Sequence, residues 1–111
     1  MPIYEIIVDT TNKALTLYKD NEYFKTYLIA VGKKSTPTPK GIFEIISKSK
    51  NPGGPYGVRW MGLSIPHYGI HGTNNPSSIG KEISHGCIRL LNENVIELYD
   101  LVPIGTKVEI I

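Results

Sequence analysis

The chain holds a single cysteine, Cys87, within the string Ser84-His85-Gly86-Cys87. A cysteine becomes a nucleophile where a neighbouring base or a positive environment favours its thiolate. His85 stands two positions before it, and Gly86 lets a substrate approach the backbone closely. The amides of Gly86 and Cys87 are then candidate donors to a developing oxyanion. These neighbours favour a catalytic thiol over the alternative, a small buried hydrophobic residue.

A second candidate, His71, follows an apolar stretch and precedes Gly72. That stretch has the character of a strand end, which is a rigid place to hold a general base. The turn-rich segment 74–80 would bring the chain back, so that His71 and Cys87 can meet. No aspartate is near in sequence, so a backbone carbonyl must orient the second ring nitrogen. Taken alone, His71 also fits a core histidine bonded to the backbone.

The same residue types allow a metal site as an alternative. The three histidines and the cysteine, all between positions 67 and 87, form a possible zinc set: His67, His71, His85 and Cys87. Against zinc, the chain has no CxxC or HExxH string, and a proline and a glycine flank His67 where a helix would be needed. We therefore expect no metal and no other cofactor. His67 itself is predicted to be a surface loop residue.

Length and composition indicate one globular domain over residues 1–111. Hydrophobic residues make up 41% and charged residues 20% of the 111 residues. The net charge of +2 gives no electrostatic footprint for nucleic acid. The longest apolar stretch, 27–31, is far shorter than the roughly 20 residues that span a bilayer. Glu5 and Asp9 occupy the place of a signal peptide, so we expect either no export by that route or a leader already removed.

Residues 1–50 alternate between apolar and polar positions, which predicts half-buried strands. The apolar positions of these strands are Tyr4, Ile6, Val8, Leu15, Leu17, Phe24, Leu28, Ala30, Phe43 and Ile45. Segments 10–13 and 20–21 are predicted turns, because Asn and Asp tolerate a left-handed backbone. Residues 51–90 are rich in glycine and poor in charge, and they carry every histidine and the cysteine.

Residues 91–111 predict one short helix and a last strand. The helical spacing joins Val95, Leu98, Tyr99 and Val102. Asn92 is the expected N-cap, and the segment 103–105, with a proline and a glycine, ends the helix. Glu93, Glu97 and Asp100 are expected on its solvated face, and Val108 and Ile110 are expected to point inward from the strand 106–111. The fold class is mostly β, a β-sandwich or barrel-like domain with one helix near the C-terminus.

The stretch HGTNNPSSIGKEISHGCIRL, residues 71–90, resembles the signature of the L,D-transpeptidase catalytic domain, or YkuD domain. That signature pairs an upstream histidine with a downstream [ST]-x-G-C string. The TPTPKG loop at 36–41 and the segment GPYGVRWMGLSIP at 54–66 also resemble this family. The resemblance covers nearly the whole chain.

The resemblance implies a mostly-β L,D-transpeptidase fold with a cysteine at its active site. Cys87 corresponds to the nucleophile, His71 to its base, and Gly72 to the carbonyl that orients the histidine. Gly86 and His85 complete the catalytic set. The remaining candidates are assigned to substrate binding: Ser84, Arg89, Tyr56 and Trp60. For Arg89 a structural role is the alternative to binding a substrate carboxylate, and for Tyr56 and Trp60 the alternative is aromatic packing.

The family further implies action on peptidoglycan stem peptides. The cysteine forms a thioester with the residue in position three and releases D-Ala, after which an amine makes a 3→3 cross-link. Water as the acceptor would make the protein an L,D-carboxypeptidase, and an inactive wall-binding module is an alternative from another class. The resemblance also implies β-lactams, carbapenems above all, as covalent inhibitors. The expected location is the cell wall or spore envelope, with cytoplasmic synthesis or a trimmed chain as alternatives.

Overall fold

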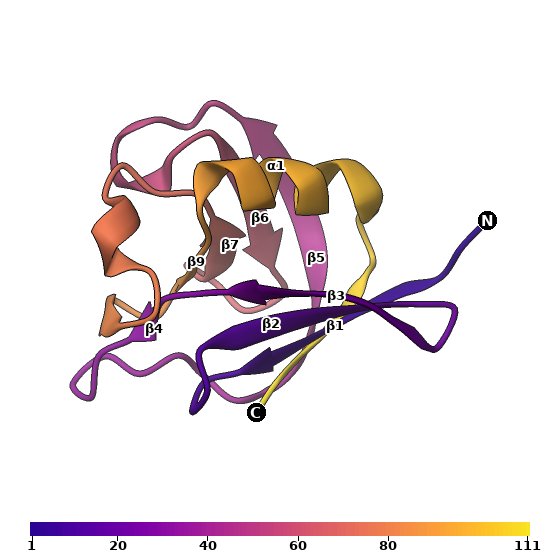
Figure 1. Ribbon diagram of the computed structural model, residues 1–111, viewed down its shortest axis with the longest axis horizontal. Helices are drawn as coiled ribbons and strands as arrows, with labels where there is room; N and C mark the ends of the chain where they lie inside the picture. The colour runs from indigo at the N-terminus through magenta and orange to yellow at the C-terminus, as the bar shows by residue number, and fades with distance from the viewer.

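The computed structural model describes residues 1–111, and strands make up most of its regular structure (Figure 1). The strands are β1 (Tyr4–Asp9), β2 (Ala14–Lys19), β3 (Glu22–Leu28), β4 (Val31–Gly32), β5 (Gly41–Lys50), β6 (Arg59–Leu63), β7 (Gly69–His71), β8 (Glu82–Ser84), β9 (Ile88–Arg89) and β10 (Lys107–Ile110). One α-helix, α1 (Asn92–Leu101), and two 3-10 turns, η1 (Gly54–Tyr56) and η2 (Pro76–Ser78), complete the fold. This confirms a mostly-β protein with one helix near the C-terminus.

Eight strands form one sheet in the order β3-β2-β1-β10-β5-β6-β7-β9, and β4 and β8 pair separately. The pairs β1–β10 and β7–β9 are parallel, while the other neighbours in the large sheet are antiparallel. The sheet curls, so that β1, β2 and β3 lie to one side of α1 and β5, β6 and β7 to another (Figure 1). The helix therefore closes the hollow of a half-barrel, and the core fills the space between them.

The alternation in the first two strands is confirmed by burial. Tyr4, Ile6 and Val8 of β1 and Leu15 and Leu17 of β2 all belong to one buried core cluster. They meet buried residues from the other half of the sheet and from α1: Met61, Ile70, Ile88, Val95 and Leu98. The predicted turns also form, with a positive φ at Lys13, Asp20 and Asn21.

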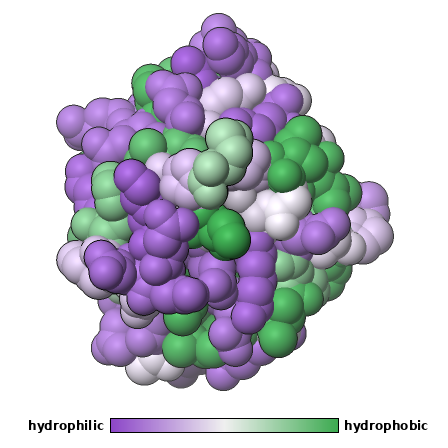
Figure 2. Space-filling model, turned by 90° about the vertical axis from the view of Figure 1, so that its right-hand side faces the viewer, coloured by the Kyte–Doolittle hydropathy of each residue, from purple (hydrophilic) through white to green (hydrophobic).

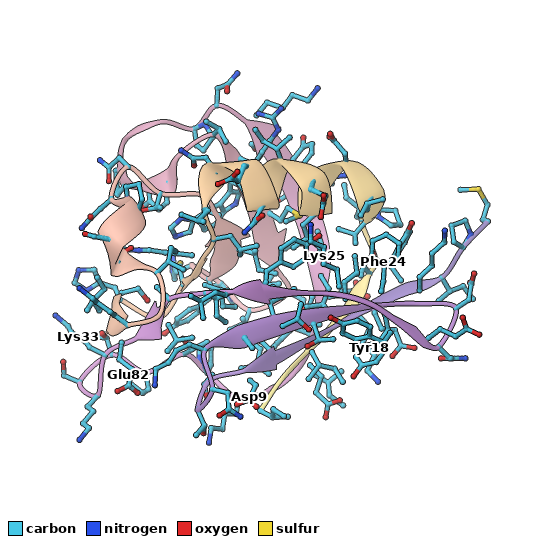
Figure 3. All side chains as sticks on the ribbon, viewed as in Figure 1. Asp9, Tyr18, Phe24, Lys25, Lys33 and Glu82 are labelled. Carbon is cyan, nitrogen blue, oxygen red and sulfur yellow. The ribbon has the colours of Figure 1, made fainter.

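The prediction for β3 is wrong in its face. Leu28 is 55% exposed and Phe24 is 43% exposed, whereas Tyr27 is buried. Tyr27 points to α1 because its hydroxyl donates to Glu97 Oε1 at 2.5 Å, and Lys25 Nζ lies 2.7 Å from the same oxygen. Figure 3 shows Lys25 beneath the helix. Glu97 is therefore a link between helix and sheet and not simply part of a solvated acidic face.

The helix begins and ends differently from the prediction. Leu91 is the N-cap and Asn92 lies inside the first turn, where its side chain makes no cap hydrogen bond. Asn92 Oδ1 instead accepts the Thr73 amide at 3.0 Å, which ties the helix to the loop after β7. At the other end, Lys48 Nζ donates to two carbonyls, those of Tyr99 at 2.6 Å and Val102 at 2.9 Å. A cation at this end compensates the helix dipole.

Large apolar side chains at the surface are spread over several elements. Those with the greatest exposure include Ile3, Tyr23, Ile42 and Ile104. In Figure 2 the apolar areas on the face at the N-terminal end are separated by hydrophilic ones. No helix has both the length and the apolar character needed to cross a membrane.

Candidate active site

One row of side chains crosses four strands and places the candidate residues side by side. Across β5, β6, β7 and β9 the paired residues are Ser49, Trp60, His71 and Arg89. Successive residues of a strand point to opposite faces. Their neighbours Met61, Ile70 and Ile88 are therefore on the other face, and they are buried in the core. The period-two pattern thus sends His71 and Arg89 to the surface on which the site lies.

Cys87 lies in the turn between β8 and β9, and the Ser84 hydroxyl holds that turn together. The hydroxyl donates to the Cys87 carbonyl at 2.7 Å and accepts the Gly86 amide at 3.0 Å. Gly86 has a φ of 117°, and a Cβ there would come within 2.4 Å of the Tyr68 ring. A side chain at position 86 is excluded by both conformation and space.

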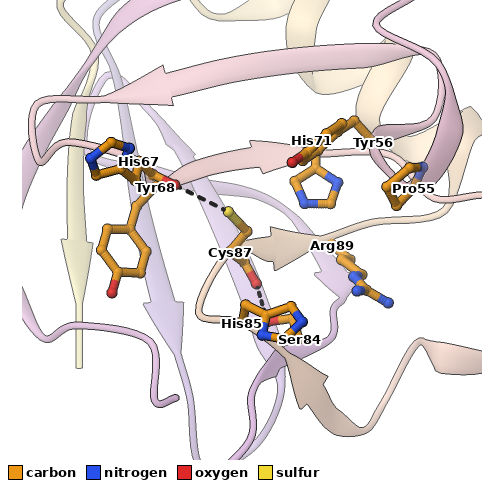
Figure 4. Close-up of a pocket in the computed structure, with 9 residues that line it drawn as sticks. All are labelled: Pro55, Tyr56, His67, Tyr68, His71, Ser84, His85, Cys87 and Arg89. Atoms are coloured by element: carbon orange, nitrogen blue, oxygen red, sulfur yellow. Dashed lines mark hydrogen bonds between the residues drawn. The ribbon is translucent and has the colours of Figure 1, made fainter.

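The Cys87 thiol rests against the turn between β6 and β7. Its Sγ donates to the His67 carbonyl, 3.7 Å away (Figure 4). His67 is exposed in this turn, as expected, and it has a positive φ of 74°. Attack by the thiol therefore requires its proton to leave the His67 carbonyl for a stronger base.

His71 ends β7 and is held on three sides. Its Nδ1 lies 2.5 Å from the Gly72 carbonyl oxygen. A carbonyl only accepts, so Nδ1 carries the proton and Nε2 has the free lone pair. The Trp60 ring stacks on the imidazole with centroids 5.6 Å apart and planes 16° apart. Tyr56 meets it edge-on at 5.1 Å. The side chain is only 2% exposed.

Burial sets the protonation states of the two residues. Loss of hydration lowers the His71 pKa to about 4, and the Arg89 charge adds to this, while the bond to the Gly72 carbonyl opposes it. Burial also raises the pKa of the Cys87 thiol, against smaller opposing effects of the Gly69 amide and the Arg89 charge. Thiol and imidazole are thus both neutral at rest, which is the state that a general-base mechanism needs.

A tight junction beneath the site fixes the loop that carries the Gly72 carbonyl. Asn92 Oδ1 accepts a hydrogen bond from the Thr73 amide. The same oxygen leaves no room for a side chain at Gly72 or Gly57. A Cβ would come within 2.2 Å of this oxygen from Gly72 and within 2.3 Å from Gly57. The orientation of His71 therefore depends on a helix residue far away in sequence.

These residues line a pocket of about 280 Å³. Its lining consists of Pro55, Tyr56, His67, Tyr68, His71, Ser84, His85, Cys87 and Arg89 (Figure 4). The structure brings together the sequence candidates from three separate segments. The Gly86 amide already donates to the Ser84 hydroxyl. Of the two amides considered as donors to an oxyanion, only that of Cys87 is left as a candidate.

Arg89 is the only lysine or arginine of this lining, which contains no aspartate or glutamate. Its Nε is buried without a hydrogen-bond partner in the protein. Guanidinium groups pair readily with carboxylates. Because Arg89 lines the pocket, its guanidinium is able to pair with an anionic group of a ligand. The possible zinc set is not assembled, since no three His, Cys, Asp or Glu side chains lie close enough together to hold a metal ion.

A family model, described as the L,D-transpeptidase catalytic domain YkuD, matches residues 3–110. The chain belongs to this family. The putative L,D-transpeptidase YkuD of Bacillus subtilis is 58% identical over 107 residues, which are 96% of this chain and 65% of the relative. The chain thus spans less than two-thirds of that relative's length.

Solved L,D-transpeptidase structures share the whole fold. The catalytic domain of the Enterococcus faecium L,D-transpeptidase is 31% identical, with a TM-score of 0.84, and the match covers 100% of this chain and 98% of that domain. The Ldtfm–avibactam carbamoyl enzyme is also 31% identical, with a TM-score of 0.86 over 100% of this chain and 49% of the other.

Two residues that line the pocket of this L,D-transpeptidase-family site, Pro55 and Tyr68, are not among the candidates that the sequence indicates. His67 also lines the pocket, and it is exposed, as the sequence predicts. The sequence signal for the place of His67 is Pro66, which favours a turn just before the strand that ends at His71. Trp60 lies outside the pocket lining and packs against His71, so its expected role in substrate binding is not direct within this pocket.

Proposed function

We propose that this domain is a cysteine L,D-transpeptidase that acts on peptidoglycan stem peptides in the cell wall. The observation that carries the proposal is the pocket in which Cys87, Arg89 and an oriented, neutral His71 meet. Family membership supports the reaction class. The similar Ldtfm structure is a carbamoyl enzyme formed with avibactam, which supports expecting covalent modification here too.

In the first half of the reaction, His71 Nε2 takes the Cys87 proton while Sγ attacks the carbonyl carbon of the third stem residue. The C–S bond forms, and the carbonyl oxygen becomes an oxyanion, for which the Cys87 amide is the candidate donor. His71 then gives its proton to the departing amine nitrogen as the C–N bond breaks. D-Ala leaves, and a thioester remains on Cys87.

In the second half, an acceptor amine loses a proton to His71 and attacks the thioester. The C–S bond breaks, and Sγ recovers the proton from His71. The product is a 3→3 cross-link between two stems. Arg89 is the group suited to bind the carboxylate of the donor's terminal D-Ala, because it is the only lysine or arginine that lines the pocket. Water in place of the amine gives L,D-carboxypeptidase activity with the same residues.

The test is incubation of the protein with a tetrapeptide stem, with and without an amine acceptor, followed by mass analysis of the products. We expect D-Ala release and a cross-linked dimer in wild type and neither in Cys87→Ser, whose hydroxyl ionises far less readily than a thiol. D-Ala release without a dimer identifies a carboxypeptidase. An intact tetrapeptide with folded wild-type protein supports an inactive wall-binding module instead.

A covalent probe tests the nucleophile separately. A carbapenem is expected to add its mass once to the wild-type protein, on Cys87. Cys87→Ala is the control, since it keeps the pocket but has no thiol. An adduct that persists in this variant would show that another side chain reacts.

A further inference from the structure

A second groove runs beside the catalytic pocket, and the mechanism above does not use it. This aromatic groove, of about 440 Å³, is lined by Ser49, Pro52, Tyr56, Trp60 and His67. Two of these residues, Tyr56 and His67, also line the catalytic pocket. Figure 4 places them toward opposite ends of that pocket. A ligand bound in the groove therefore lies against the catalytic pocket.

The floor of the groove is the flat face of an aromatic ring. The Trp60 indole lies over Gly62, two residues further along its own strand β6, and over Gly69 of the neighbouring strand β7. A Cβ on Gly69 would come within 2.6 Å of the indole, and one on Gly62 within 3.3 Å of its Nε1. Tyr56 stands almost perpendicular to Trp60, at 85° and 5.4 Å between centroids, and it is 45% exposed. The two rings form an angled aromatic corner that is open to solvent.

The lining chemistry selects the class of ligand. None of the five side chains is an acid, a lysine or an arginine, whereas the neighbouring pocket holds Arg89. The groove thus has aromatic faces with a hydroxyl, a phenol, an indole N–H and an imidazole at its edges. Trp and Tyr suit ligands that are apolar on one side and polar at the rim. A pyranose ring with an N-acetyl group has that character, and it is neutral.

The covalent structure of the substrate proposed above brings a sugar ring close to the aromatic groove. The stem peptide is joined to an N-acetylated amino sugar, and the reacting carbonyl belongs to its third residue. Three residues span at most about 10 Å when extended. A donor with its third residue at Cys87 must therefore place its sugar just outside the pocket. The free carboxylate and amine of an acceptor stem, by contrast, find no opposite charge in the aromatic groove.

We propose that the aromatic groove binds an N-acetylated amino-sugar ring of the donor's glycan strand, stacked on Trp60 and Tyr56. This inference rests on the proposed function, and it makes the preferred donor a stem still attached to its sugars. Ser49 pairs with Trp60 across β5 and β6, is exposed, and does not line the catalytic pocket. Ser49→Gln should cover the indole and fill the groove. Ser35→Gln, at an exposed turn residue that lines neither the catalytic pocket nor the groove, is the matched control.

The experiment compares kcat/KM for D-Ala release from a free tetrapeptide and from the same tetrapeptide on its disaccharide. We expect the disaccharide form to be about tenfold better in wild type and in Ser35→Gln. In Ser49→Gln the ratio should fall to about one. A wild-type ratio of one, or a ratio that Ser49→Gln leaves unchanged, overturns the assignment. Failure of both substrates in wild type instead refutes the proposed function on which it rests.

Direct binding supplies a readout that needs no turnover. Trp60 is the only tryptophan, so its indole N–H gives a single NMR signal within the groove. A neutral trimer of N-acetylglucosamine should shift this signal saturably in wild type and Ser35→Gln but not in Ser49→Gln. An unmoved signal in wild type overturns the proposal. A signal that responds to a free acceptor stem and not to the sugar would make the groove a peptide subsite, which also overturns it.

Discussion

Mild acid should destabilise this protein through His71. The pKa of His71 falls from its ordinary value of 6.5 to about 4 because the folded chain buries the ring. Between these two values the unfolded chain binds the proton and the folded chain does not. The free energy of unfolding therefore rises with pH across this range and falls as the solution is acidified. One pKa unit corresponds to about 1.4 kcal/mol, so acidification from pH 7 to about pH 4 removes about 3 kcal/mol through His71 alone.

Equilibrium urea unfolding at these two pH values measures this loss. His71→Asn keeps an amide able to donate to the Gly72 carbonyl but has no titrating ring. We expect wild type to lose about 3 kcal/mol more than this variant on acidification. His67→Asn, at an exposed histidine of the same pocket, is the control and should behave as wild type. If wild type and His71→Asn lose the same amount, His71 is not held neutral by burial and the reasoning fails.

Three further outcomes test the site. His71→Ala should slow carbapenem acylation of Cys87 about a hundredfold, as expected for a lost general base, while His85→Lys keeps measurable activity. Mass spectrometry of the adduct over time measures both rates. If His85→Lys is inactive and His71→Ala is near normal, the roles of the two histidines are exchanged. Trp60→Leu should let water reach the His71 imidazole, so the acidic limb of the pH profile for acylation should move from about pH 4 toward 6.5. Trp60→Phe, which keeps an aromatic ring, should leave the profile unchanged. Identical pH profiles for wild type and Trp60→Leu would mean that stacking does not exclude water from the imidazole. Asn92→Ala should lower the free energy of unfolding by about 1–2 kcal/mol, since the buried Thr73 amide loses its acceptor; unchanged urea unfolding would contradict this.

Much of this protein follows from local pattern. Alternation alone identified the buried faces of β1 and β2, because a strand that is half-buried must repeat every two residues. The same reasoning failed for β3, where Tyr27 is buried and Leu28 exposed. Hydrophobicity ranks Leu above Tyr, but the partner across the core is Glu97 on α1, which offers the Tyr27 hydroxyl a hydrogen bond. That partner is 70 residues away, so no local pattern contains it.

The sequence likewise indicates the candidate residues of the site, but it does not indicate their protonation states. Residue type and motif singled out Cys87, His71 and Arg89, and the need for a backbone carbonyl beside His71 was inferred from the missing aspartate. Only the fold shows that Gly72 supplies a carbonyl within hydrogen-bond distance and that Trp60 covers the imidazole. Protonation depends on how much water reaches a group and which charges surround it. The access of water and the surrounding charges are both set by strands that pair across the sheet. The sequence therefore determines which groups can react, and the tertiary structure determines their protonation states.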